Sequence, residues 1–572
     1  MNKPFLQFNF QQTVRQFTNP IKVWNGTNIK EIPAMFEELE QFLDKGYYIA
    51  GFVSYEAAPA FDPSYHVHKD NGLPLIWFAA YEKPFDKTDR LEDMDYQLSD
   101  WIDTTSYEDY QVNINRIKKA IEEGNTYQVN YTTRLKSRFI GNPYSFYQQL
   151  VENQAASYCA YLDIGENQIL SASPELFFQV KDGKIITKPM KGTIKRGRTY
   201  REDLQFKQTL RDSVKDQAEN VMIVDLLRND IGRIAKPGTV NVTSLFDVET
   251  YPTVHQMTST IEASLEKMKV YDWFQALFPC GSITGAPKVE TMKYIAALED
   301  TPREVYCGAI GWISPAREAI FNVPIRTVIV NGNNAIFGTG GGITWDSTSK
   351  NEYDELKQKA AILHQKRKVV SLLESIKLEN GKYPLMPYHL QRLKHSTQYF
   401  DFPFHEESVK EKLSVLAEKN QNGCYKVRLL YHPSGKIELD HQAVNRLEQP
   451  VSTVIASEPV DKENIYLYHK TTNREIYEKF DQAKPSHILT TLLWNEQGLI
   501  TEFTIGNIVV EKDGRFFTPP VSDGLLPGTY REQLINEGIL VEKSIPLANI
   551  TTYEQIWFIN SVRGWLKVQL IQ

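Results

Sequence analysis

Residues 338–355 read GTGGGITWDSTSKNEYDE, a glycine-rich apolar strand followed by a strongly charged helix. Glu352 and Glu355 are three residues apart, so a helix presents both carboxylates on one face. Two such acids repel each other unless water or a bound cation screens their charges. The pair is therefore explained equally well by a cation site and by a solvated protein surface. The glycine run exposes backbone N–H groups suited to a carboxylate ligand, although an ordinary tight turn has the same pattern. This stretch alone leaves both interpretations open.

Four segments upstream carry residues of matching chemistry, namely SPE at 173–175, PMKGT at 189–193, a predicted helix at 214–231 and GSITGAPK at 281–288. On the predicted helix, Glu219 shares a stripe with Ile223 and Leu226, and an acid beside an apolar stripe needs a partner. A magnesium ion held by Glu219, Glu352 and Glu355 would satisfy all three acids and bridge to an acidic ligand. Lys191 and Glu175 suggest a nucleophile and an acid, although a lysine at the end of a strand is usually exposed.

Composition limits the class of protein. The 572 residues suggest three or four domains, and 64 Lys plus Arg against 71 Asp plus Glu give a net charge of −7. An acidic balance argues against nucleic acid or an anionic membrane as the main partner. Four scattered cysteines without metal-ligand spacing indicate a reducing compartment. Because we find no signal peptide and no long apolar run, we expect a cytoplasmic protein.

Hydrophobic periodicity predicts strands at 47–55 and 74–81 and a helix at 107–124. Beyond residue 369 it predicts a hairpin over 372–385 with Asn380-Gly381 at its turn, a helix at 388–399, and a strand pair at 425–431 and 436–439. We place the domain boundary near residue 367, in the basic stretch QKRK. The expected fold class is a multidomain α+β or α/β protein with domains 1–366 and 367–572, the second split into subdomains of about 370–455 and 456–572.

The C-terminal 200 residues contain the parts of a pyridoxal phosphate site. Such a site needs an amine, a carboxylate for the pyridine nitrogen and a phosphate cradle of arginine and helix-start N–H groups. Lys470 in YHKTTNR, Glu502 in LITEFTIGNIVV and Arg392 in HLQRL supply the first three groups. The turn LLPGTYRE at 525–532 leads into a predicted helix. Each piece alone is unremarkable, because a lone lysine is usually a surface residue.

Together the segments between about 106 and 360 resemble the chorismate-utilising family of anthranilate, aminodeoxychorismate, isochorismate and salicylate synthases. AGFVSYEAAPAFD at 50–62 resembles the aminodeoxychorismate synthase branch. The resemblance implies a sandwich of two antiparallel sheets flanked by helices. It implies a magnesium site at Glu219, Glu352 and Glu355, with Glu175 as the acid beside the departing C4 hydroxyl. The substrate-binding residues that it implies are His255, Thr284, Tyr306, Arg326, Gly340, Gly341 and Gly342, although Tyr306 is equally plausible as a core residue.

Lys191 distinguishes between the aminodeoxychorismate synthase and anthranilate synthase branches of this family. Aminodeoxychorismate synthases are similar to this chain in having lysine in PMKGT, where anthranilate synthases have alanine. The resemblance implies that the lysine amine adds at C2 of chorismate as the 4-hydroxyl leaves, after which ammonia adds at C4 and expels the lysine. A free amine requires a lowered pKa, through desolvation or nearby cations such as Lys188 and Lys195. Because no Gly-x-Cys-x-Gly elbow is present, the resemblance implies ammonia from a separate glutamine amidotransferase subunit.

The order of the C-terminal motifs resembles the class IV aminotransferase fold, which includes branched-chain and D-amino acid aminotransferases and aminodeoxychorismate lyase. The resemblance implies that Lys470 forms the Schiff base with pyridoxal phosphate and shuttles a proton, that Glu502 faces the pyridine nitrogen, and that Arg392 binds phosphate. The backbones of Thr504, Ile505, Gly506, Thr529 and Tyr530 would complete the phosphate site. The family's first strands, before LLESI, are absent here, which leaves the substrate side and a homodimer through this domain open.

The two resemblances imply successive activities. The first half would aminate chorismate at C4, and the second would eliminate pyruvate from 4-amino-4-deoxychorismate to give 4-aminobenzoate, the folate precursor. One alternative is an anthranilate synthase fused to a transaminase, which Lys191 opposes. The other is an active synthase whose second half is a non-catalytic docking module.

Overall fold

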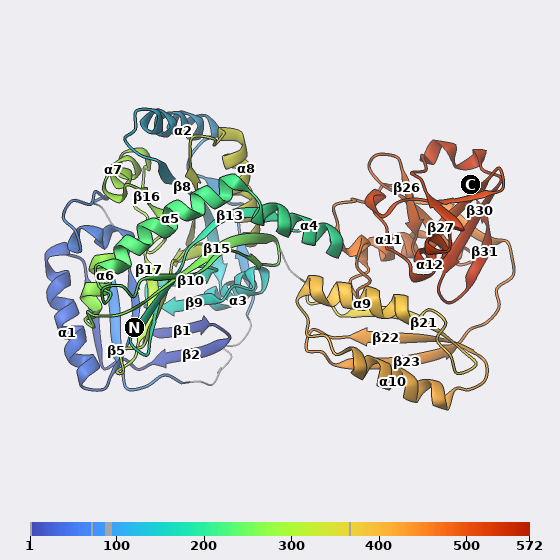
Figure 1. The fold of residues 1–572 in the computed structure, drawn as a ribbon, viewed down its shortest axis with the longest axis horizontal. Helices are drawn as coiled ribbons and strands as arrows, with labels where there is room; N and C mark the ends of the chain where they lie inside the picture. The colour runs from blue at the N-terminus through green and yellow to red at the C-terminus, as the bar shows by residue number, and fades with distance from the viewer. Residues whose placement is uncertain (1–2, 70–71, 86–93, 365–367, 572) are drawn as a thin grey trace. The chain divides into compact units, whose positions relative to one another are not determined.

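The computed structural model describes residues 3–69, 72–85, 94–364 and 368–571 (Figure 1). The chain forms two compact units, of which the first comprises Met1–Lys195 with Lys207–Arg367 and the second Arg196–Phe206 with Lys368–Gln572. The boundary predicted near residue 367 falls in 365–367, outside the described residues. Among the helices of the described ranges, none combines the length and apolar character needed to span a membrane.

The first unit is a sandwich of two antiparallel sheets, each of ten strands. One sheet has the order β16-β8-β20-β19-β10-β9-β1-β2, with β6 and β7 also on β8. Its strands are β16 (Gly285–Ala286), β8 (Gln128–Gly141), β20 (Asn334–Ile343), β19 (Thr327–Asn331), β10 (Asn167–Ser173), β9 (Tyr158–Asp163), β1 (Phe5–Phe10), β2 (Thr13–Thr18), β6 (Tyr96–Leu98) and β7 (Ile102–Asp103).

The other sheet has the order β13-β15-β12-β11-β18-β17-β4-β5-β3, with β14 also on β15. Its strands are β13 (Met190–Lys195), β15 (Val254–Ser264), β12 (Lys184–Lys188), β11 (Leu176–Lys181), β18 (Ala319–Asn322), β17 (Ala309–Ile313), β4 (Tyr48–Val53), β5 (Ile76–Tyr81), β3 (Lys22–Gly26) and β14 (Asn241–Thr250). The predicted strands at 47–55 and 74–81 are confirmed as β4 and β5.

Strand β5 shows how the layers are built. Side chains alternate between the faces of a strand, so Phe78 packs under the outer helices while Trp77 and Tyr81 pack between the sheets. Both faces of β5 are therefore apolar, as expected for a strand in the middle layer. The helices over this second sheet include α1 (Ile32–Asp44), α5 (Val214–Gly232) and α6 (Val270–Leu277). Helix α5 packs on β13 and β15 (Figure 1).

The remaining helices of the first unit are α2 (Tyr107–Glu122), α3 (Pro143–Gln154), α7 (Lys288–Leu298) and α8 (Ser349–Ala360), with α4 (Tyr200–Arg211) beginning in the second unit. Helix α3 covers the outer face of the first sheet, where Phe146 and Leu150 join its core. The helix predicted at 107–124 is confirmed as α2, and the expected two-sheet sandwich with flanking helices is confirmed as a whole.

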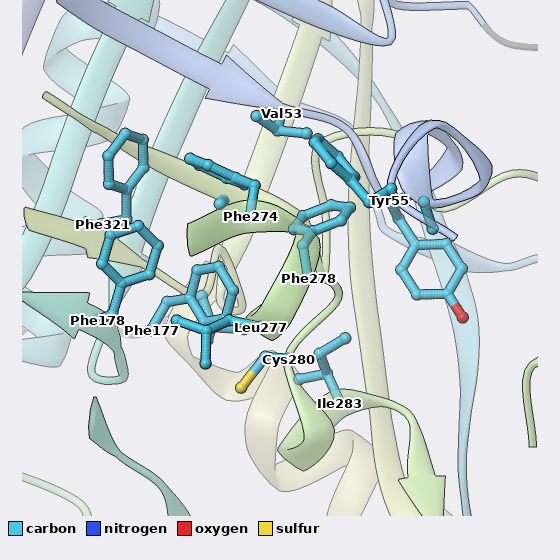
Figure 2. Packing of buried hydrophobic residues seen from close by; sticks show 14 of the residues in the cluster. Val53, Tyr55, Phe177, Phe178, Phe274, Leu277, Phe278, Cys280, Ile283 and Phe321 are labelled. Carbon is cyan, nitrogen blue, oxygen red and sulfur yellow. The ribbon is translucent and has the colours of Figure 1, made fainter. Parts of the chain in front are cut away.

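Aromatic packing fixes the turn that follows α6. The rings of Phe178 and Phe274 lie 5.6 Å apart, and Phe321 lies 5.2 Å from each of them (Figure 2). Cys280 and Ile283 are buried in the same cluster, on either side of Ser282. Close packing of this kind holds backbone position tightly, so the intervening serine is presented in a fixed place.

The second unit contains two sheets. The smaller has the order β21-β22-β23, from β21 (Leu372–Glu379), β22 (Cys424–Tyr431) and β23 (Ile437–Ala443). The larger has the order β26-β25-β24-β31-β30-β27-β28-β29, from β24 (Val451–Ile455), β25 (Thr490–Trp494), β26 (Ile500–Phe503), β27 (Asn507–Lys512), β28 (Arg515–Thr518), β29 (Leu540–Glu542), β30 (Gln555–Asn560) and β31 (Gly564–Leu570). Its helices beyond 368 are α9 (Met386–Phe400), α10 (Glu406–Lys419), α11 (Glu475–Ala483) and α12 (Thr529–Asn536).

The hairpin predicted over 372–385 is wrong in its second arm. Asn380 and Gly381 do form the turn, with φ of 48° and 74°, but only one bridge, Glu379 to Lys382, follows it. Pro384 has no N–H to donate and helix α9 begins at Met386, so no strand can return here. Strand β21 pairs with β22 instead. The predicted helix at 388–399 and the predicted strand pair around residue 434 are confirmed as α9 and β22–β23.

Residues 196–206 belong to the second unit although they interrupt the first. The Arg196 guanidinium forms an ion pair of 2.7 Å with Asp203 and lies 4.3 Å over the Tyr399 ring. The Tyr399 hydroxyl donates to the Gly197 carbonyl at 2.8 Å, and its ring lies 4.1 Å from that of His469. This segment therefore helps to build the surroundings of the residue before Lys470.

Candidate active sites

One cavity of about 360 Å³ in the first unit gathers most of the predicted residues. Its lining includes Glu175, Lys191, Glu219, Tyr306, Arg326, Gly340, Gly341, Gly342, Glu352 and Glu355. They come from β13, β20, α5 and α8 and from the segments before β11, β17 and β19, so sequence positions as far apart as 175 and 355 meet in one place. The cavity also contains Lys359, Gln256 and Ser282, which the sequence analysis did not single out.

Lys191 lies deep in this cavity, against the glycine run. A Cβ on residue 342 would lie 3.0 Å from Lys191 Nζ and 2.0 Å from Gln128 Nε2, so only glycine leaves room here. Burial lowers the pKa of Lys191, the carboxylates of Glu219 and Glu175 oppose that fall, and the Lys359 ammonium adds to it. Lys359 therefore takes the place we expected for Lys188, which pairs with Glu249 instead.

Glu175 is the buried acid of the cavity. Burial raises its pKa to about 7, while the hydrogen bond from Ser282 and the charge of Lys191 oppose the rise. The Ser282 hydroxyl donates to Glu175 Oε1 at 2.6 Å. A carboxyl group with this pKa can hold a proton at neutral pH and deliver it to a leaving hydroxyl. Ser282 lies within the quoted GSITGAPK, but the motif gave no signal for its contact with Glu175.

The three remaining acids carry surplus negative charge. Burial raises the pKa of Glu219 and of Glu352, and the charge of Glu355 adds to both rises. Lys359 lies 2.7 Å from Glu355 Oε1 and lowers its pKa. Within the described ranges, no group of three or more His, Cys, Asp or Glu side chains is placed to hold a metal ion unaided. The donors are the oxygen type that Mg²⁺ prefers, and Mg²⁺ normally completes its shell with water and substrate oxygens.

Two predicted residues do not line the cavity. His255 is buried on β15 beside Thr250, whose Oγ1 lies 3.1 Å from His255 Nδ1, and the adjacent Gln256 faces the cavity. Thr284 is buried and donates to the Cys280 carbonyl at 3.1 Å. Gln256, next to His255, and Ser282 and Ile283, just before Thr284, line the cavity instead.

We expect Gly342→Ala to impair the first unit. The added methyl group collides with the Gln128 amide and crowds the Lys191 amine, which costs roughly 1–3 kcal/mol of stability and about 100-fold in rate if the amine shifts by about 1 Å. The matched control is Gly232→Ala at the end of α5, where nothing lies within 4 Å. Thermal melts and the rate of chorismate consumption measure both effects, and a Gly342→Ala protein with unchanged rate would contradict the placement of Lys191.

A second cavity, of about 440 Å³, lies within the second unit. All the predicted cofactor residues line it, namely Arg392, Lys470, Glu502, Thr504, Ile505, Gly506, Thr529 and Tyr530. The small sheet contributes one wall through β21 and β22, and the larger sheet and the start of α12 contribute the other.

Lys470 and Glu502 have complementary electrostatics. Burial, together with the charges of Arg392 and Arg474, lowers the pKa of Lys470 to about 8. Burial raises the pKa of Glu502 to about 7, although its carboxylate accepts hydrogen bonds from the Tyr477 hydroxyl at 2.8 Å and the Leu526 N–H at 3.1 Å. The other oxygen, Oε2, accepts from the Asn507 amide at 3.3 Å, so three donors hold this carboxylate in place, and its remaining lone pair can meet a ring N–H.

Another part of the cavity lining is suited to phosphate. Thr529 and Tyr530 begin α12, and the first N–H groups of a helix have no intrahelical acceptor. Arg392 is held by Glu374, to which Nε donates at 2.9 Å and Nη2 at 2.6 Å. Glu374 also contacts His389 Nδ1 at 2.7 Å, so two residues that the sequence analysis missed fix the arginine. The cavity therefore has the amine, carboxylate and phosphate cradle that pyridoxal phosphate requires.

We expect Lys470 to react with pyridoxal phosphate faster as the pH rises. Only the free amine attacks an aldehyde, so a pKa of about 8 predicts a rate that rises roughly tenfold per pH unit below neutrality and levels off above about pH 9. Stopped-flow absorbance of cofactor-free protein mixed with pyridoxal phosphate measures it. Lys470→Arg should show no lysine-dependent band, and a rate that keeps rising tenfold per pH unit beyond about pH 9, as for an ordinary lysine, would contradict the lowered pKa.

Two family models match the two parts of the chain that contain these cavities. Residues 3–365 match the chorismate binding enzyme family, and residues 371–571 match amino-transferase class IV. The first match covers more than half of the chain. The chain belongs to the chorismate-binding enzyme family. Its second part has a class IV aminotransferase domain, a fold that implies pyridoxal phosphate.

Relatives of this chorismate-binding enzyme include aminodeoxychorismate synthase component 1 of Klebsiella aerogenes, 39% identical over 300 residues, and of Salmonella typhimurium, 40% identical over 303. These matches cover 52% and 53% of this chain and 65% of each relative, so the chain spans about two thirds of their length. Anthranilate synthase component I from Streptococcus pneumoniae has a similar structure, with a TM-score of 0.53 and 25% identity over 64% of this chain and 91% of that one.

Proposed function

We propose that the first unit converts chorismate and ammonia into 4-amino-4-deoxychorismate. The Lys191 amine forms a bond to C2 of chorismate as the C4 hydroxyl departs, and Glu175 supplies the proton with which that hydroxyl leaves as water. Ammonia then forms the C4–N bond and the lysine amine is expelled from C2. The lowered pKa of Lys191 and the raised pKa of Glu175 support these roles, since each favours the required protonation state.

We propose that Glu219, Glu352 and Glu355 hold Mg²⁺ when substrate is bound. Burial raises the pKa of Glu352 and the charge of Glu355 adds to the rise, which supports this assignment because a divalent cation would relieve both effects. The ion would neutralise a substrate carboxylate beside these acids. Arg326 and Tyr306 also line the cavity and would contact the substrate.

The second unit is proposed to turn that product into 4-aminobenzoate and pyruvate. Pyridoxal phosphate, when bound, supplies the electron sink that makes the proton at C4 removable. Lys470 takes this proton, Glu502 holds the proton of the pyridine nitrogen, and Arg392 with the start of α12 holds the phosphate. The C3–O bond to the enolpyruvyl group breaks as the ring becomes aromatic.

Ammonia is proposed to come from a separate glutamine amidotransferase subunit, as the component 1 relatives suggest. A homodimer through the second unit remains a prediction. A cytoplasmic location is supported by the free thiols of Cys159, Cys280, Cys307 and Cys424.

One observation carries the whole proposal: each cavity is lined by a lysine together with a buried glutamate, and the surroundings lower the pKa of the lysine and raise that of the glutamate. To test it, the protein is mixed with chorismate, ammonium and magnesium, with and without pyridoxal phosphate. Chromatography should show 4-aminobenzoate only with the cofactor and the unaromatised amine without it. Anthranilate would instead favour the anthranilate synthase alternative, and an identical product mixture in both samples would favour a non-catalytic second unit.

A further inference from the structure

The small sheet of the second unit turns a cationic face toward the Lys470 cavity. Lys426 and Arg428 are two residues apart on β22, so both project from the same face, and both line the cavity. Their neighbours Val427 and Leu429 point the other way into the core under α9 and α10. Because Val427 and Leu429 are buried on the opposite face of β22, Lys426 and Arg428 are held on the cavity side.

A third cation faces the same space from the larger sheet. Arg563 lies in the turn between β30 and β31, where its Nη1 donates to the Asn445 carbonyl at 3.0 Å. The Ser561 hydroxyl of this turn donates to the Ser375 carbonyl of β21 at 2.9 Å, which joins the turn to the small sheet. The three cations thus come from two sheets whose edges are hydrogen-bonded to each other.

Among the described residues these three charges have no direct ion-pair partner, and the nearest acid in the register is Asp440, the cross-strand neighbour of Arg428. Among the described residues, none of Lys426, Arg428 and Arg563 forms an ion pair, and Glu502 is the only carboxylate in the cavity lining. Asp440 lies opposite Arg428 in the register, but its Oδ1 accepts from the His441 N–H at 2.8 Å. Burial lowers the pKa of Lys426, and the charges of Arg563, Arg474 and Arg428 lower it further.

Two other arginines of the cavity are held in ion pairs, and Arg474, which has no ion pair among the described residues, is bonded to the backbone of the proposed phosphate site. Arg392 is paired with Glu374, Arg531 with Glu542, and the Arg474 guanidinium donates to the Thr504 carbonyl at 2.9 Å. They lie with the proposed phosphate and pyridine contacts. The unpaired group on β22 and the β30–β31 turn therefore remains for a different anion, on the substrate.

We propose that Lys426, Arg428 and Arg563 form a carboxylate-binding subsite that selects a substrate with two carboxylate groups over amino acids with one. The proposal rests on the proposed function of the second unit. 4-Amino-4-deoxychorismate carries one carboxylate on the ring, para to the amino group, and a second on the enolpyruvyl group. With its amino group directed to Lys470, both carboxylates are available to cations away from that amine.

The test uses Arg428→Gln, Lys426→Gln and Arg563→Gln in the full-length protein. Each should raise the KM for 4-amino-4-deoxychorismate by about 10- to 100-fold, with less effect on kcat, because each removes one charge-assisted contact that forms before the chemical step. The visible absorbance of bound pyridoxal phosphate should not change. Arg428→Lys should restore part of the affinity, and the matched control Lys382→Gln, on an exposed loop outside the cavity, should resemble the unmodified protein.

Competitive inhibitors provide an independent readout. Isophthalate, with two carboxylates, should inhibit the unmodified protein at least about tenfold more tightly than benzoate, and this preference should vanish in Arg428→Gln. Normal KM values in all three glutamine variants, together with no preference for isophthalate, would overturn the subsite. A cofactor-loaded protein that releases no 4-aminobenzoate would refute the proposed function, and equilibrium binding of isophthalate and benzoate, followed by the absorbance of the bound cofactor, would still show whether the subsite exists.

Discussion

Lys470→Ala is expected to abolish release of 4-aminobenzoate, by roughly 1,000-fold or more, and to remove the lysine-dependent visible band. We assign to this side chain both the attachment of the cofactor and the removal of the C4 proton. Loss of either role alone would slow the reaction by a large factor. The other lysine of lowered pKa in the described lining, Lys426, is assigned to the substrate carboxylates and not to the cofactor. The measurement is product chromatography with the absorbance spectrum of the same sample.

The first unit should remain active in this variant, so 4-amino-4-deoxychorismate should accumulate. Lys479→Ala is a matched control, since Lys479 is a half-exposed lysine of the same unit, paired with Glu458. If Lys470→Ala kept the visible band and formed 4-aminobenzoate at the normal rate, the assignment of the second cavity would be wrong.

Lys191→Ala should eliminate amination at C4, again by about 1,000-fold or more, because no other group forms the bond to C2. Any residual product should be anthranilate, since ammonia would then attack C2 directly. Binding of chorismate should persist, because Arg326 and the glycine strand are untouched. Chromatography that separates the 2-amino and 4-amino products measures the result.

Lys181→Ala, at the exposed end of β11, serves as the control for loss of a positive charge. Undiminished 4-amino product from Lys191→Ala would exclude the covalent role. The second unit should still convert added 4-amino-4-deoxychorismate at the normal rate in this variant, which separates loss of the first step from misfolding.

Motif spacing predicted most of both cavities because the motif residues sit on strands and helices whose packing brings them together. It failed where a neighbouring residue faces the cavity instead. His255 and Gln256 are adjacent on β15, and a strand turns successive side chains to opposite faces, so the motif alone does not say which one meets the ligand. The same limit applies to Thr284, whose neighbours Ser282 and Ile283 line the cavity.

Contacts between residues that are far apart in the sequence could not be predicted from the motifs. Lys359 affects Lys191 only because α8 lies beside β20, and Glu374 positions Arg392 from a strand that pairs differently from the predicted hairpin. The cationic group of Lys426, Arg428 and Arg563 combines residues more than 130 positions apart, none of which belongs to a motif quoted from the sequence. These residues come together only in the folded chain, so their spacing in the sequence does not reveal the group.

The most direct test of the central claim is the position of nitrogen in the final product. The protein is incubated with chorismate, magnesium, pyridoxal phosphate and ¹⁵N-ammonium, and the aromatic product is identified by NMR. Two lysines acting in sequence predict 4-aminobenzoate with ¹⁵N on C4 and one pyruvate per ring. Label on C2, in anthranilate, would contradict the account.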